Sequence, residues 1–170
     1  MKQHSDYITH IKNDEDLVYL KKQHCPVNMR LFTTSTEYKA IILQQCEYIR
    51  QNCLEEKIGY KKPHGMSSAN VGLAFNIIGI TRFRNKPIEY CEIMINPVIL
   101  KTIGKKVNSL SNCGSLTLED AILIKRWETV KVAYFTEEGV YKENIFGRDN
   151  GSFTIQHEID HNLGILITDL

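Results

Sequence analysis

Residues 152–164 read SFTIQHEIDHNLG and contain the most informative pattern in the chain. His157 and His161 are four residues apart, so on an α-helix their imidazoles lie on one face, one turn apart. Both rings can then reach a single metal ion, and the adjacent Glu158 can contact a water bound to that ion. The pattern predicts a helix over residues 152–163, ended by the following glycine, that carries a metal-dependent hydrolytic centre.

A pair of histidines on a helix supplies only two metal ligands, whereas a catalytic zinc-type site usually has three protein ligands and a water. In the metzincin class of metalloproteases, the third ligand is a histidine six residues after the second. Ile167 occupies that position here, and only nine residues follow His161. We therefore expect the third ligand to come from an upstream segment, which excludes most protease interpretations of the motif.

The segments upstream of this helix show two other kinds of pattern. Apolar runs and alternation, separated by turn residues, predict β-strands at residues 88–95, 97–103, 121–125, 129–135 and 140–146. The capping box Thr34–Glu37 begins a helix that we expect to run to Leu54. Its apolar stripe comprises Tyr38, Ile41, Ile42, Cys46, Ile49 and Cys53. The predicted fold class is α+β, with mainly antiparallel β-sheets around a central C-terminal helix and one N-terminal helix.

Length and composition favour one globular domain. The chain has 170 residues, of which 42% are hydrophobic, and we expect a loose polar segment at residues 1–15 followed by a single domain over residues 16–170. Lys and Arg total 21 against 20 Asp and Glu, so the composition offers no broad cationic surface and we expect no direct binding of nucleic acid.

The distribution of apolar residues and cysteines indicates a reducing compartment. The longest nearly apolar run, residues 71–80, is only about half as long as a membrane span, and no apolar block typical of a secretory signal lies in the first thirty residues. The five cysteines are odd in number and include no C-x-x-C pair. We expect no membrane association and a location in the cytoplasm or another reducing compartment, organelles included.

Three motifs, in order along the chain, resemble those of the peptide deformylase family. Residues 156–161 (QHEIDH) fit the family's Q-H-E-x-D-H in full, and residues 70–79 (NVGLAFNIIG) are similar to its G-V-G-L-A-A-P-Q-I-G. Residues 113–117 (CGSLT) correspond to its E-G-C-L-S. Supporting similarities lie at residues 20–27, 95–97 and 124–126, so the resemblance covers about residues 16–170 and implies a deformylase-like fold.

The resemblance implies an enzyme that removes formate from the N-formylmethionine of new polypeptides. Its partner would be an N-formylated peptide or the N-terminus of a nascent chain. Its cofactor would be one divalent metal ion, Fe2+ in the cell or Zn2+ or Ni2+ after purification, held by two histidines and one cysteine. Carried over by position, His157 and His161 are metal ligands, Glu158 is the general acid/base, and the backbone N–H near Leu116 stabilises the oxyanion.

The motif at residues 70–79 implies the substrate-binding residues. Val71, Gly72 and Leu73 would offer a backbone edge to an extended peptide. Ile77 occupies the position of the family's glutamine, whose side-chain amide also contacts the oxyanion. The isoleucine side chain has no hydrogen-bond donor. Losing one such donor typically costs about 2.7–4 kcal/mol of transition-state stabilisation. The sequence therefore leaves two functions open: an active deformylase, or a catalytically impaired relative that binds peptide N-termini without efficient turnover.

The third metal ligand is also open at this point. Ser115 stands where the family has its ligand cysteine, and a neutral hydroxyl is a poor ligand beside a thiolate. Cys113 lies two residues earlier, and on a strand the side chains of such residues project from the same face. Cys113, Ser115 or a water could complete the site, and we take Cys113, His157 and His161 as the expected ligand set. The sequence does not define an oligomeric state.

Overall fold

The structure of the protein, a computed structural model, describes residues 20–55, 62–83, 86–116 and 120–170. The segment 1–15 that we expected to be loose lies outside these residues. The described strands form one antiparallel sheet in the order β1-β2-β3-β4-β5. Their bounds are Gly65–Ser67 (β1), Ile77–Arg82 (β2), Tyr90–Ser111 (β3), Ile122–Phe135 (β4) and Tyr141–Phe146 (β5). The predicted α+β class is confirmed, with one sheet in place of several.

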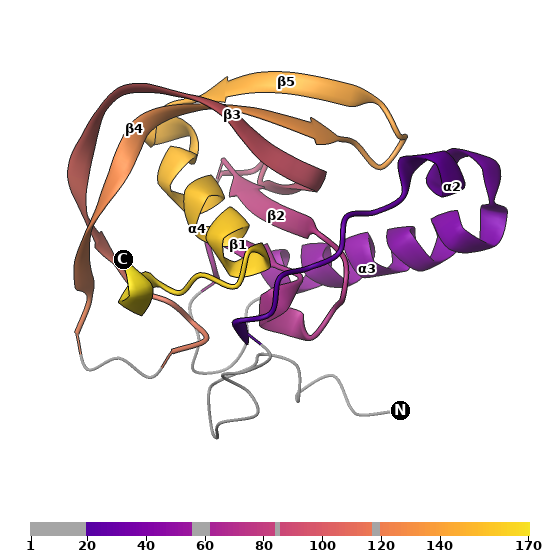
Figure 1. The fold of residues 1–170 in the computed structure, drawn as a ribbon, viewed down its shortest axis with the longest axis horizontal. Coiled ribbons are helices and arrows are strands. Elements are labelled where there is room, and N and C mark those ends of the chain that lie inside the picture. Colours follow the sequence, from indigo (N-terminus) through magenta and orange to yellow (C-terminus); the bar gives the residue numbers. More distant parts are fainter. Residues whose placement is uncertain (1–19, 56–61, 84–85, 117–119) are drawn as a thin grey trace.

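The described helices lie on both faces of this sheet (Figure 1). Their bounds are Met29–Thr34 (α2), Thr36–Leu54 (α3) and Ser152–Asn162 (α4). Short 3-10 turns at 69–71, 148–150 and 167–169 connect or follow these elements. Of the helices in the described part of the chain, none combines the length and the apolar character needed to span a membrane.

Strand alternation divides the core between the two faces of the sheet. Ile77 of β2 and Ile93 of β3 pack with the buried side chains of α3, whereas Ile78 and Met94 pack with Ile155 of α4. Neighbouring residues of β2 thus point to opposite faces, as the period of two requires. The central strands are apolar on both faces because each face is covered by a helix. The C-terminal helix is therefore held against one face of the sheet by an apolar core of its own.

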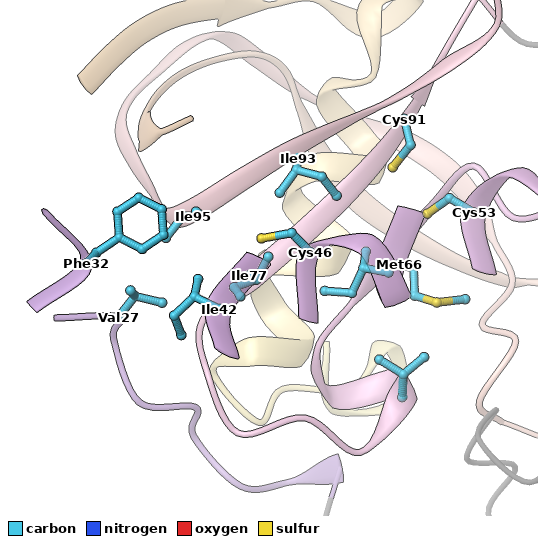
Figure 2. Close-up of a cluster of buried hydrophobic side chains, with 12 residues drawn as sticks. Val27, Phe32, Ile42, Cys46, Cys53, Met66, Ile77, Cys91, Ile93 and Ile95 are labelled. Carbon is cyan, nitrogen blue, oxygen red and sulfur yellow. The ribbon is translucent and has the colours of Figure 1, made fainter. Parts of the chain in front are cut away.

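The cluster under α3 contains three buried cysteines (Figure 2). Cys46 and Cys53 are fully buried on α3, as the helical periodicity predicts, and Cys53 lies beside Cys91 of β3. The close approach of α3 depends on Gly79, since a Cβ there would lie 2.7 Å from both the Cys91 sulfur and a methyl carbon of Ile49. A side chain at this position would push helix and sheet apart.

Two local predictions need correction. The N-cap of α3 is Ser35, whose side chain accepts a hydrogen bond from the N–H of Tyr38, and not Thr34. Thr34 is the last residue of α2, a helix that the sequence patterns did not predict, and its hydroxyl donates to the carbonyl of Arg30. The predicted apolar stripe is also too wide, because Ile41 is 45% exposed.

The long strands β3 and β4 each replace a pair of predicted strands. β3 covers both predicted segments from residue 90 onward, and it continues past Pro97 because the register with β4 shifts between Ile95 and Val98. Such an irregularity accommodates a residue that cannot donate to the ladder. β3 and β4 form one long bent hairpin, and the chain after β3 leads directly to Cys113.

Asn96 connects this bulge to the N-terminal part of the chain. It has a positive φ of 52°, and its side-chain amide accepts from the N–H of Val27 at 2.7 Å and donates to the carbonyl of Val27 at 2.8 Å. Asparagine tolerates the left-handed conformation better than most residues. The Asn96 side chain thus pairs with both the N–H and the carbonyl of Val27, which is buried and would otherwise need backbone partners for these groups.

We predict that Asn96→Gly lowers the free energy of unfolding by about 1–3 kcal/mol, because two hydrogen bonds to buried backbone groups are lost while the positive φ is still tolerated. Asn96→Ala should be less stable still, by roughly 1 kcal/mol, because alanine is strained in this conformation. Urea unfolding of the three proteins measures both differences. Wild-type stability in Asn96→Gly would show that the contacts with Val27 contribute nothing.

Candidate metal centre

Helix α4 and the loop after β3 bring three potential metal ligands together. The Cys113 sulfur lies 3.2 Å from Nε2 of His161, and that nitrogen lies 3.2 Å from Nε2 of His157. The three ligand atoms all lie within 4.8 Å of one another. The two imidazoles come from successive turns of α4, as the spacing in the sequence predicts, and meet edge to face with their ring centroids 4.6 Å apart.

The spacing of these atoms fits a single tetrahedral ion. With metal–nitrogen bonds of about 2.0–2.1 Å and metal–sulfur bonds of about 2.3 Å, ligand atoms in a tetrahedral site are separated by roughly 3.3–3.6 Å. The two distances of 3.2 Å are close to these values. Nδ1 of His161 is buried and has no hydrogen-bond partner among the described residues, so the ring is oriented by packing and by its Nε2 side.

The protonation of the two histidines suits a cation. Burial lowers the pKa of His157 to about 3, and the positive charges of His161 and Arg126 act in the same direction. Burial likewise lowers the pKa of His161 to about 4. Both imidazoles are therefore neutral near pH 7, which is the form that binds metals.

The environment of Cys113 is mixed. Burial raises the pKa of the Cys113 thiol to about 11, and the charge of Glu158 adds to this shift. The polar groups of Ser115 and the N–H of Leu116 lie near the sulfur and act on this pKa in the opposite direction. Burial thus disfavours a thiolate at Cys113, and a cation at this position would compensate the charge.

Glu158 lies next to these groups on α4 and is almost completely buried. Burial raises its carboxyl pKa to about 8, and the charge of Arg126 opposes the shift. One of its carboxylate oxygens has no hydrogen-bond partner among the described residues. A carboxyl group with a pKa near neutrality can both accept and donate a proton at physiological pH.

The other polar residues of the 156–161 motif attach α4 to strand β4. The Gln156 amide donates to the carbonyl of Trp127 at 2.9 Å and accepts from its N–H at 3.1 Å. Asp160 forms an ion pair with Arg126, which is buried. The sequence pattern predicted no role for Gln156 or Asp160, although their spacing of four residues places them on one helix face.

A cleft of about 480 Å³ opens beside Glu158 and His157. Its walls come from the segment before β1, from the end of β3 and the following loop, and from the first turns of α4. The lining residues are Pro63, His64, Gly65, Ser109, Leu110, Ser111, Asn112, Gly114, Phe153, Thr154, His157 and Glu158. Phe153 and Thr154 precede His157 by four and three residues, a spacing from which sequence reasoning could have assigned them to this site.

The structure separates the two candidate ligands of the 113–117 loop. The Cys113 sulfur contacts His161, whereas Ser115 is 1% exposed and its Oγ accepts a hydrogen bond from Nδ2 of Asn70 at 2.8 Å. The N–H of Leu116, which we expected to face the oxyanion, donates to the carbonyl of Cys113 at 3.1 Å. The loop thus folds back on Cys113.

The four expected substrate-binding residues lie outside the lining of the cleft. Val71 and Ile77 belong to the buried cluster under α3, and Figure 2 shows Ile77 close to Ile42. Gly72 has a positive φ of 71° after a 3-10 turn, and Leu73 packs partly against the same cluster. The backbone beyond Leu73 is paired with the N-terminal segment, since the N–H of Cys25 donates to the carbonyl of residue 74.

Comparison with known proteins agrees with this geometry. Residues 17–170 match the model of the polypeptide deformylase family. The chain belongs to the peptide deformylase family. It is 29% identical over 147 residues to a peptide deformylase of Karelsulcia muelleri, with 76% of each chain covered. It is 37% identical over 103 residues to that of Clostridium beijerinckii, covering 57% of this chain and 70% of the relative.

Solved deformylases share the fold. The Met-Ala-Ser-bound class I type b peptide deformylase of Acinetobacter baumannii superposes with a TM-score of 0.73 and 23% identity, with 95% of each chain covered. The peptide deformylase of Thermotoga maritima gives a TM-score of 0.66 and 25% identity, over 96% of this chain and 95% of that one. The family is metal-dependent, and the group formed by Cys113, His157 and His161 is the corresponding candidate site in this deformylase family member.

We predict that the protein, purified without oxygen, binds one divalent ion. Cys113→Ala should weaken this binding by more than about 100-fold, because the loss of a ligand exceeds the usual effect of losing a residue that only orients a ligand. Cys25→Ala, which removes an exposed thiol, is the matched control and should bind as wild type does. Metal analysis and chelator competition measure both. Wild-type affinity in Cys113→Ala would exclude the sulfur as a ligand.

Proposed function

We propose that this deformylase family member removes the formyl group from N-formylmethionyl peptides. The observation that carries the proposal is the position of Glu158. Glu158 lines a cleft together with His157, and His157 is one of three residues whose ligand atoms could hold a single ion. We propose Cys113, His157 and His161 as the residues that hold this ion, with Fe2+ in the cell and Zn2+ or Ni2+ as alternatives. Such an ion supplies a Lewis acid that acidifies water and polarises a carbonyl oxygen.

In this mechanism Glu158 transfers the proton. Its carboxylate takes a proton from the water that attacks the formyl carbon, and it gives that proton to the methionine nitrogen when the carbon–nitrogen bond breaks, so formate and a free amine are the products. The raised pKa of about 8 gives the buried carboxyl group the affinity for protons that this exchange needs. Burial also excludes bulk water from the transfer.

The cleft offers a place for the methionine and the following peptide. Leu110 and Phe153 are apolar, and Ser111 and Asn112 supply polar groups beside them. This combination suits an apolar side chain on a polar main chain. Because the N–H of Leu116 is already used by Cys113, we assign Leu116 to the turn that holds the sulfur rather than to the oxyanion.

One observation favours the second function, binding of peptide N-termini without efficient turnover. At Ile77 the family motif has its glutamine, and the isoleucine side chain lies in the core under α3. An oxyanion in this protein would therefore lack a side-chain amide from β2. The retained glutamate favours turnover, because a protein that only binds peptides needs no general base.

We predict that the metal-loaded protein hydrolyses formyl-Met-Ala-Ser, a formylated form of the peptide bound by the Acinetobacter baumannii enzyme. Glu158→Gln should lower kcat by about 10²–10⁴-fold, because it removes the proton carrier. Glu143→Gln, on exposed β5, is the matched control and should keep the wild-type rate. Equal rates for wild type and Glu158→Gln would exclude the enzyme mechanism, and peptide binding without turnover by wild type would support the second function.

We predict that Ile77→Gln does not restore an oxyanion donor. The new amide would be buried in an apolar cluster, so it should lower the free energy of unfolding by at least about 1–3 kcal/mol and leave kcat no higher than in wild type. Urea unfolding and turnover of formyl-Met-Ala-Ser measure the two effects. A faster enzyme of unchanged stability would place residue 77 in the cleft.

A further inference from the structure

The β3–β4 hairpin has two unlike faces. Residues 106–111 of β3 pair with residues 127–122 of β4 without a shift of register, so directly opposite residues share a face. One face is turned inward, since Ile124 lies in a buried cluster and Arg126 pairs with Asp160 of α4. The residues between them in sequence therefore point away from α4. On this outer face lie Lys106, Asn108 and Leu110 of β3 and Leu123, Lys125 and Trp127 of β4.

The outer face continues along the hairpin toward β5 (Figure 1). Lys131 of β4 lies opposite Lys101 of β3. Val130 and Val132, on either side of Lys131, belong to the core under α4, so Lys131 points to the outer face. Lys105 is exposed in the irregular stretch of β3 between these two parts. The lysines of the outer face are thus Lys101, Lys106, Lys125 and Lys131, with Lys105 at its bulge.

Most of this positive charge is uncompensated. Lys131 pairs with Glu143 of β5 at 2.6 Å. The other four lysines are exposed, and none of them forms an ion pair with a residue that the structure describes. Glu128 of β4 belongs to the inner face by alternation. Since Lys125 and Lys131 are six residues apart on one strand, the excess charge extends over about 20 Å.

An aromatic side chain lies among these lysines. Trp127 is half-buried and lies opposite Lys106, whose ammonium nitrogen is 5.6 Å from the centre of the ring. It is the only tryptophan of the chain. Cationic side chains along a surface, with an aromatic ring between them, are the combination that binds the phosphates and bases of single-stranded nucleic acids.

We propose that the outer face of the β3–β4 hairpin binds single-stranded RNA, with the lysines on phosphates and Trp127 beside a base. The inner face of the same hairpin brings Ser109 and Ser111 to the cleft, so RNA on the outer face leaves the cleft open. The choice of RNA rests on the proposed function, because the N-terminus of a new polypeptide emerges from a ribosome, whose surface is largely RNA.

The proposal differs from the expectation drawn from composition. The balance of 21 Lys and Arg against 20 Asp and Glu is a sum over the whole chain. Binding of a polyanion depends instead on the charges that one surface presents together. The pairing of β3 with β4 gathers lysines from residues 101–106 and 125–131 on one side, an arrangement that a sum over the chain does not contain.

The test measures the binding of a fluorescent oligouridine of about 20 nucleotides to the protein without metal or peptide. The logarithm of the affinity should fall by about 0.7 per phosphate contact for each tenfold rise in salt, or by roughly 3 for four lysines. Replacing the four lysines that lack ion pairs should weaken binding at low salt by at least about 10-fold and remove most of this salt dependence. That variant is Lys101→Gln/Lys105→Gln/Lys106→Gln/Lys125→Gln.

The matched control removes four exposed cationic side chains from other surfaces. It is Lys22→Gln/Arg30→Gln/Lys86→Gln/Lys142→Gln, and it should keep nearly the wild-type affinity and salt dependence. Trp127 gives a second readout, because the emission of the only tryptophan should change when RNA binds the outer face. If the outer-face variant does not fold, Lys125→Gln alone carries the test, with a salt slope lower by about 0.7.

Absence of oligouridine binding, equal weakening by both variants, or unchanged Trp127 emission in the complex would overturn the proposal. Tighter binding of anionic vesicles or polyglutamate through the same lysines would also overturn it, because the face would then suit a membrane or an acidic protein. Turnover of formyl-Met-Ala-Ser is measured separately and should be equal in wild type and both variants. Its absence in wild type would contradict the proposed function and leave the measured RNA binding as it is.

Discussion

The structure depends on one constraint: helix α4 must carry two imidazoles and a carboxyl group into the interior of a small protein. Burial lowers the pKa of His157 and raises the pKa of Glu158, so it favours the neutral form of both side chains. Neutral groups cost less free energy to bury than charged ones. The remaining polar side chains of the motif pair with β4, through Gln156 and the Asp160–Arg126 ion pair. An apolar core under the same helix then holds it against the sheet. The six-residue motif therefore supplies the contacts that hold α4 against β4 as well as the reactive groups.

The motifs that lie far apart in the sequence meet around this helix. The N–H of His24 donates to the carbonyl of Asn162 at the end of α4, and a Cβ on Gly164 would lie 2.2 Å from the carbonyl oxygen of Lys21. Only glycine permits this contact, and its φ of 77° lies in the left-handed region. Asn96 holds the same N-terminal segment through Val27. The similarities at residues 20–27 and 95–97 thus describe one region of the fold, where the chain closes over the end of α4.

Local periodicity predicted the elements whose cause is local. The extent of α3 and α4 and the α+β class follow from spacing, and the strand at residues 141–146 follows from alternation. The continuous strands β3 and β4 could not be predicted in this way, because Pro97 indicates a break that a change of register in the partner strand removes. The cleft was missed for a similar reason. Its walls join residues 63–65, 109–114 and 153–158, which come together only when the sheet has formed.

The proposed third ligand, Cys113, lies at another position in the motif than the family's cysteine. An alignment compares residue numbers and assigns the site to Ser115, whereas coordination depends on where a sulfur atom lies relative to two fixed nitrogens. A turn in which the N–H of Leu116 bonds back to the carbonyl of Cys113 brings the earlier side chain to the histidines. The later one is then free to interact with Asn70. In the proposed site, the ligand lies two residues earlier in the loop, and the fold of the loop brings its sulfur to His161. The hydrogen bonds that fix this loop, such as the one from the N–H of Leu116 to the carbonyl of Cys113, are then required for metal binding as the ligand itself is.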